Sequence, residues 1–101
     1  MAYTVEYSPE AIKHIRRLPA HRRATIMDQI EQRLTYEPTV AGRNRKRMHP
    51  DKKQFVAPWE QRLGDVRVYY AVEEEAKKVV VLAVGIKERE RLFIGGREFE
   101  P

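Results

Sequence analysis

The sequence predicts an α+β domain in which two helices cover one face of a mostly antiparallel four-stranded sheet. Three observations predict this fold. A short alternating segment at the N-terminus is followed by two segments whose apolar residues have helical spacing, and three strand-like segments come after them. At 101 residues the chain has room for one modest core, so we expect a single domain over residues 1–101.

The first predicted strand covers residues 3–7, where aromatic or aliphatic side chains alternate with polar ones. The next three residues predict the start of a helix. Ser8 is a suitable N-cap, Pro9 fits the first helical position, and Glu10 places an acid in the first turn.

Two segments have apolar residues at helical spacing. The stripe of the first helix, which Pro19 ends, consists of Ala11, Ile12, Ile15 and Leu18. The second helix runs from about Ala20 to Tyr36, before Glu37 and Pro38, and its stripe consists of Ala24, Met27, Ile30 and Leu34. Helices of this length are not stable alone, so both stripes are expected to pack on a common apolar surface.

The second half of the chain supplies that surface as three strands. Residues 55–63 form one, which Pro58 makes an edge strand, a bulged strand or a strand that starts late. Residues 66–72 alternate clearly and place Arg67 on the face opposite the valines. The apolar run 79–84 is typical of a central strand buried on both faces. We expect the face that carries Arg67 to be concave and partly open.

Positive charge is concentrated in the stretch between the helices and the sheet, residues 43–53. Its balance of six basic residues against one acid equals the net charge of the whole chain, +5. The basic residues are Arg43, Arg45, Lys46, Arg47, Lys52 and Lys53. A basic loop at the rim of the Arg67 face would attract a phosphate backbone or an acidic protein. The alternative is a solvated loop whose charge serves only solubility.

Several function classes find no support in the sequence. The chain has no cysteine, which favours a reducing compartment, and its N-terminus does not resemble a signal peptide. The longest apolar run is far shorter than a membrane span, so we expect a cytoplasmic protein. No spacing of His, Asp and Glu predicts a metal site, and no glycine-rich phosphate loop is present. No cofactor is expected.

Two segments resemble a known family. Residues 59–70, Trp-Glu-Gln-Arg-Leu-Gly-Asp-Val-Arg-Val-Tyr-Tyr, and Val84-Gly85 with Lys87-Glu88-Arg89 are similar to the RelE/ParE superfamily of bacterial toxins from type II toxin–antitoxin modules. The order of elements extends the resemblance to nearly the whole chain. It implies a cognate antitoxin as partner, and operator DNA through the antitoxin complex.

The resemblance implies one of two activities. RelE-like members cut mRNA in the ribosomal A site without a metal, whereas ParE-like members act on DNA gyrase. We favour the first, a ribosome-dependent mRNA endoribonuclease that inhibits translation. The alternatives are a gyrase inhibitor without enzymatic activity, or a module that has lost catalysis and binds only antitoxin and operator DNA.

The resemblance also implies roles for individual residues in the attack of a ribose 2′-hydroxyl on the adjacent phosphate. Arg67 matches an arginine that stabilises the phosphate. Lys87 stands where the family has a second phosphate-binding arginine, and Phe93 stands where it has a base-stacking tyrosine that assists proton transfer. Two family lysines have no counterpart, so His49 or Glu60 is our candidate proton acceptor.

RNA contacts are expected from basic and aromatic residues around this site. The candidates are Arg43, Arg45, Lys46, Arg47, Lys52, Lys53, Trp59, Arg62 and Arg89. Some have other interpretations: Trp59 could be a core anchor, Arg67 could only pair with Glu60, and residues 87–91 could be an exposed charged segment. His14 and His21 are interpreted as surface groups.

Overall fold

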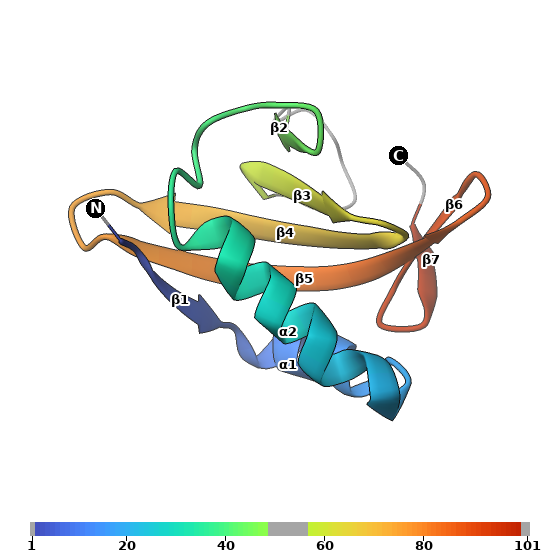
Figure 1. Cartoon of the computed structure of the whole chain (residues 1–101). Coiled ribbons are helices and arrows are strands. Elements are labelled where there is room, and N and C mark those ends of the chain that lie inside the picture. Colours follow the sequence, from blue (N-terminus) through green and yellow to red (C-terminus); the bar gives the residue numbers. More distant parts are fainter. Residues whose placement is uncertain (1, 49–56, 100–101) are drawn as a thin grey trace.

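The structure, a computed structural model, describes residues 2–48 and 57–99 (Figure 1). Two helices and seven strands lie in these ranges. The helices are α1 (Pro9–Arg16) and α2 (Ala20–Leu34). The strands are β1 (Thr4–Tyr7), β2 (Arg45–Arg47), β3 (Trp59–Leu63), β4 (Val66–Glu73), β5 (Lys78–Glu88), β6 (Arg91–Ile94) and β7 (Arg97–Phe99).

The long strand β5 is the centre of the sheet. Strands β2 to β7 follow one another in space as they do in the sequence, each antiparallel to the next, and β1 pairs with β5 in parallel. Because β4 occupies one edge of β5, β1 and β6 share the other edge: β1 pairs with residues 78–81 and β6 with residues 85–88. Figure 1 shows these two strands at opposite ends of β5.

The predicted α+β architecture is confirmed, but the predicted number of strands is wrong. The sheet contains three strands, β2, β6 and β7, that the sequence did not predict. Each has only three or four residues and carries arginine, so none shows the apolar alternation of a half-buried strand. The strand expected over residues 55–63 starts late, at Trp59, which was one of the three alternatives.

The helices begin as predicted and pack on one face of the sheet. The Ser8 hydroxyl accepts a hydrogen bond from the Ala11 N–H at 3.1 Å, and Pro9 occupies the first turn. The buried residues of α2 are Ile26, Ile30 and Leu34. The prediction for Ala24 is therefore wrong: Ala24 is exposed and Ile26 takes the core position, because the apolar stripe lies further around the helix.

Apolar clusters cover both faces of β5, and a β-bulge changes which of its residues point to each face. The pairing with β4 shifts between Tyr69 and Tyr70, so the residues of β5 that face the helices change from Val79 and Val81 to Val84. Ala83 points to the other face, where it joins a smaller apolar cluster with Tyr69 and others. The continuous apolar run was therefore correctly interpreted as a central strand.

A second apolar cluster covers part of the face opposite the helices, which was expected to be concave and partly open. At its centre, Tyr69 and Ala83 are 2% and 0% exposed. Its buried members are Ala57, Tyr69, Ala83 and Ile94, with Met48, Leu82 and Leu92 packed against them. The accessible part of this face lies toward the β3–β4 turn, where the polar residues begin.

Candidate nucleic-acid interface

Four basic side chains lie on the face of the sheet opposite the helices, and we call them the cationic face. They come from four strands: Lys46 from β2, Arg62 from β3, Arg67 from β4 and Lys87 from β5. The pairing register sets their order. Arg62 lies directly opposite Arg67, which lies opposite Gly85, and Lys87 follows Gly85 by two residues on the same face. Strand pairing therefore brings together residues that are up to 41 positions apart in the chain.

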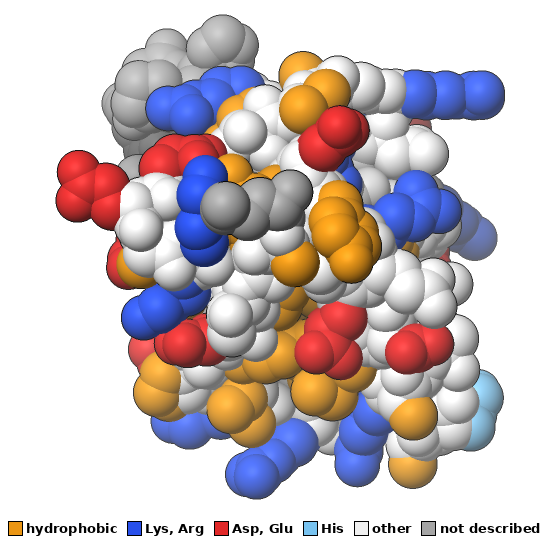
Figure 2. Space-filling model, turned by 60° about the vertical axis from the view of Figure 1, so that its left-hand side comes forward, with side chains coloured by type: hydrophobic (Ala, Val, Ile, Leu, Met, Phe, Trp, Pro, Cys, Tyr) orange, Lys and Arg blue, Asp and Glu red, His pale blue; other side chains and the backbone are white. Residues whose placement is uncertain are grey.

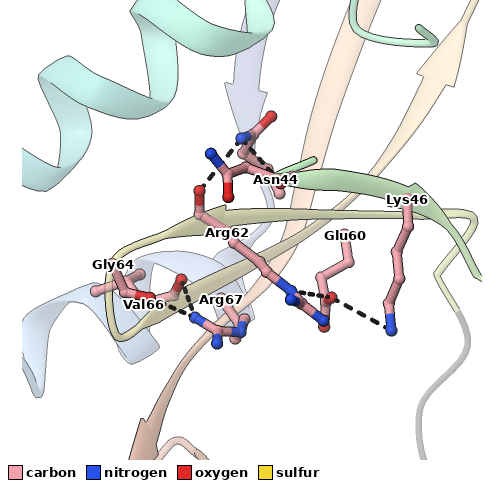
Figure 3. A network of polar contacts seen from close by, with 8 residues as sticks. Asn44, Lys46, Glu60, Arg62, Gly64, Val66 and Arg67 are labelled. Carbon is pink, nitrogen blue, oxygen red and sulfur yellow. Dashed lines mark hydrogen bonds and ion pairs between the residues drawn. The ribbon is translucent and has the colours of Figure 1, made fainter. Parts of the chain in front are cut away.

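Arg67 and Arg62 are directly opposed arginines, an arrangement that is unfavourable unless an anion is near. Arg67 folds back over the turn, where its Nη1 donates to the carbonyl oxygens of Gly64 at 2.6 Å and Val66 at 3.2 Å (Figure 3). These bonds use one of the three guanidinium nitrogens and hold the group beside the β3–β4 turn. The alternative interpretation, an ion pair of Arg67 with Glu60, finds no support among the ion pairs of the described residues.

Glu60 instead lies between two other cations (Figure 3). Its Oε1 is 3.5 Å from Arg62 Nε and 3.7 Å from Lys46 Nζ. The Glu60 side chain is only 8% exposed, whereas those of Arg62 and Lys46 are 42% and 55% exposed. A buried carboxylate is costly without such partners, so the two cations are held above it and face the solvent.

Tyr69 lies across from Glu60 on β4, at the inner side of the cationic face. Burial raises the pKa of Tyr69 far above its usual value, and the Glu60 carboxylate raises it further. The hydroxyl therefore stays protonated at neutral pH and is unsuited to accept a proton.

Lys87 completes the cationic face at the end of β5. Its backbone N–H donates to the Asp65 carbonyl oxygen at 2.7 Å, which ties this end of β5 to the β3–β4 turn. Its side chain is exposed and lies diagonally from Arg67, within the reach of a long side chain.

The structure separates Phe93 from the other predicted catalytic residues. Phe93 pairs with Ile86, a residue that packs toward the helices, so its side chain faces the helix side of the sheet. It lines a 290 Å³ pocket with His14 and Arg17 of the α1 region. Arg67 and Lys87 lie on the opposite face.

Trp59 is a core residue, which was the alternative to its interpretation as an RNA contact. The side chain is 6% exposed and stacks on Tyr70, with ring centroids 6.4 Å apart and planes 15° apart. Arg47 covers the ring with its guanidinium carbon 5.6 Å from the centroid. Since the ring is enclosed, it offers no surface on which a base could stack.

Arg45, from the same basic stretch, has a structural role that the charge count did not reveal. Its Nε donates to Gln61 Oε1 at 2.7 Å, its Nη2 to the Arg33 carbonyl oxygen at 2.6 Å, and its Nη1 to the Glu37 carbonyl oxygen. The guanidinium thus satisfies a carbonyl group in the last turn of α2 and joins that helix to β2 and β3.

The other candidates are exposed or outside the described residues. Arg43 and Arg89 are exposed, and Arg89 occupies the β5–β6 turn with a φ of 57°. His49, Lys52 and Lys53 lie outside the described ranges. On the face seen in Figure 2, basic and acidic side chains are interspersed, so no field of a single sign covers it.

His14 was wrongly predicted to be a surface group. It is half-buried, and its Nδ1 accepts a hydrogen bond from the Val84 N–H at 3.2 Å. Burial lowers its pKa, and Arg17 lowers it further against the opposing effect of Glu10. A polar residue on the sheet side of α1 was the only sequence signal for this contact. His21 is exposed, as predicted.

Among the described residues, no group of three or more His, Cys, Asp or Glu side chains could hold a metal ion. None of the helices in the described part of the chain is long and apolar enough to span a membrane.

Comparison with known proteins decides the family. The family model described as the ParE toxin of the type II toxin–antitoxin system parDE matches residues 5–91, most of the chain. The chain belongs to the RelE/ParE superfamily of type II toxins. The predicted family is therefore confirmed. No curated protein matches the sequence.

Solved structures of RelE toxins share the superfamily fold with this chain. The isolated RelE toxin of Escherichia coli is 27% identical with a TM-score of 0.62, over 87% of each chain. A RelBE2 toxin–antitoxin complex from Mycobacterium tuberculosis contains a chain 24% identical with a TM-score of 0.72, covering 86% of this chain and 93% of that one. A chain of the RelE–RelB complex from Pyrococcus horikoshii is 22% identical with a TM-score of 0.58, covering 88% of this chain and 99% of that one. The latter two likenesses concern the fold alone.

Proposed function

We propose that this RelE/ParE toxin is a ribosome-dependent endoribonuclease that cuts mRNA through its cationic face. The observation that carries the proposal is the placement of Arg67 opposite Arg62 and diagonal to Lys87, on one face of the sheet near the β3–β4 turn. Several cations around one point suit a phosphate that gains negative charge as the 2′-hydroxyl attacks it. The likeness to the E. coli RelE toxin supports this activity.

In this proposal Arg67 and Lys87 stabilise the pentacoordinate phosphate, and Arg62 and Lys46 bind the flanking backbone. Phe93 and Trp59 have no direct role, because one lies on the helix side and the other in the core. Arg43, Arg47 and Arg89 add exposed charge for the backbone. His49 remains the candidate proton acceptor from the sequence. The proposed partner protein is a cognate antitoxin, in line with the toxin–antitoxin complexes among the similar structures.

Short induction of the wild-type toxin in bacterial cells, followed by mapping of new mRNA 5′ ends, tests the activity. We expect cuts at a fixed codon phase. Arg67→Ala should reduce cleavage about 100-fold, the usual loss for one group that stabilises transition-state charge. Arg16→Ala, which removes an exposed arginine of α1 on the helix side of the sheet, serves as the matched control and should leave most cleavage intact. Undiminished cleavage by Arg67→Ala would rule the mechanism out.

The ParE family model favours a second candidate, inhibition of DNA gyrase without catalysis. Purified toxin added to a gyrase supercoiling assay separates the two. Inhibition of supercoiling, combined with normal translation and intact mRNA in induced cells, would establish the second candidate and reject the first.

A further inference from the structure

The Glu60 carboxylate lies within the cationic face, where it contacts basic side chains as a bound anion would. Two of its contacts are to basic side chains on neighbouring positions, Lys46 opposite it on β2 and Arg62 two residues along β3. A carboxylate at this position repels the phosphates of a nucleic acid, which carry the same sign of charge. If this face binds RNA, Glu60 must have a role there that outweighs its repulsion of the phosphates.

The different burial of Glu60, Lys46 and Arg62 suggests that role. The carboxylate lies beneath the cations, 8% exposed, while both basic side chains reach the solvent. Without an anion, the opposed arginines Arg62 and Arg67 would repel each other in the free protein. Glu60 supplies the missing negative charge from inside the fold.

The distances show that the cations are held loosely. The contacts of 3.5 and 3.7 Å are longer than the roughly 2.7–2.9 Å of a short charge-assisted hydrogen bond. Both cations could turn outward to a phosphate oxygen without losing a tight bond. A phosphate arriving from solvent would also carry a full charge and form shorter bonds.

We propose that Glu60 is an internal counter-anion, a positioning residue that holds Lys46 and Arg62 until a backbone phosphate of single-stranded RNA takes its place. This inference rests on the proposed function for the identity of the ligand. It assigns Glu60 no proton transfer. Its direct consequence is that the carboxylate competes with RNA for the same two cations.

Binding of a fluorescent single-stranded RNA oligonucleotide to the purified toxin tests the competition. Glu60→Gln removes the charge and keeps the shape, so we expect about 3- to 10-fold tighter binding at low salt. The slope of log K against log salt should steepen by about 0.7 for each additional phosphate contact. A purely structural role for Glu60 would change the thermal unfolding midpoint and leave that slope unchanged.

Glu75→Gln is the matched control, because Glu75 is exposed in the β4–β5 turn and its loss changes the net charge equally. Its effect on binding should be small. In Glu60→Gln/Arg62→Ala, most of the gain should disappear, since one of the released cations is gone. Equal or weaker binding by folded Glu60→Gln than by Glu75→Gln would overturn the inference, as would a lack of RNA binding by all variants. The assay contains no ribosomes, so a failure of mRNA cleavage in cells would remove the proposed function without deciding this result.

Discussion

The Nδ1 atom of His14 in α1 accepts a hydrogen bond from the backbone N–H of Val84 in β5, across 70 residues of sequence. Val84 follows the β-bulge directly, at the point where β5 changes which residues face the helices. Val84 lies between the residues of β5 that pair with β1 and those that pair with β6, so the imidazole satisfies a donor that neither strand covers, and it joins α1 to the strand that carries Lys87.

This contact predicts a loss of stability in mild acid. Because the pKa of His14 is lowered in the folded state, the folded protein binds fewer protons than the unfolded chain at pH values just below 6.5. The contribution of the neutral imidazole is fully present above pH 6.5 and is lost as the pH falls through the folded pKa. Urea unfolding at pH 7.5 and 5.5 should show this difference for the wild type and a smaller one for His14→Gln. His21→Gln, an exposed histidine change, should behave like the wild type.

Arg45 is predicted to affect stability more than RNA binding. Arg45→Ala leaves Gln61 Oε1 and the carbonyl oxygens of Arg33 and Glu37 without their charged donor. We expect the free energy of unfolding to fall by about 1.5–3 kcal/mol, the range for hydrogen bonds to a charged group. Chemical denaturation measures it. Arg43→Ala removes an exposed arginine of the same basic stretch and should change stability by no more than about 0.5 kcal/mol.

Gly85 leaves no room for a side chain beneath β6. A Cβ at this position would lie 2.7 Å from the Phe93 carbonyl oxygen and 2.8 Å from Ile94 Cγ1. Gly85→Ala is therefore expected to disturb the β5–β6 pairing and to cost about 1–3 kcal/mol of stability. Gly42→Ala, where no atom lies within 4 Å of the added carbon, is the control. Equal unfolding midpoints for the two variants would contradict this packing.

Phe93 and Lys87 lie on opposite faces of the sheet. We therefore expect substitution of Phe93 to affect stability and substitution of Lys87 to affect mRNA cleavage. Lys87→Ala should lower mRNA cleavage at nearly unchanged stability, since its side chain is exposed. Phe93→Ala should lower stability by about 1 kcal/mol or more through lost packing and leave the cleavage rate of the folded protein close to that of the wild type. Cleavage and unfolding measured on the same preparations give the comparison. Loss of cleavage by a fully folded Phe93→Ala protein would restore Phe93 to the catalytic residues.

The sequence by itself determined the order of the main elements and the face on which Arg67 lies. Both follow from local patterns: the Ser8-Pro9-Glu10 start signal and the two-residue alternation of residues 66–72 act through neighbouring residues. The family resemblance also came from short motifs along the chain, and the family model confirmed it.

Only the tertiary structure decided which residues meet. Equal charges in one stretch have different roles, because Lys46 lies over Glu60 whereas Arg45 turns inward to the end of α2. The register of β3 against β4 sets Arg62 opposite Arg67, and the pairing of β6 with β5 turns Phe93 away from both. These outcomes depend on strand pairing between distant segments, where a shift of one residue would reverse every side chain. No local pattern in the sequence predicts the register in which these strands pair.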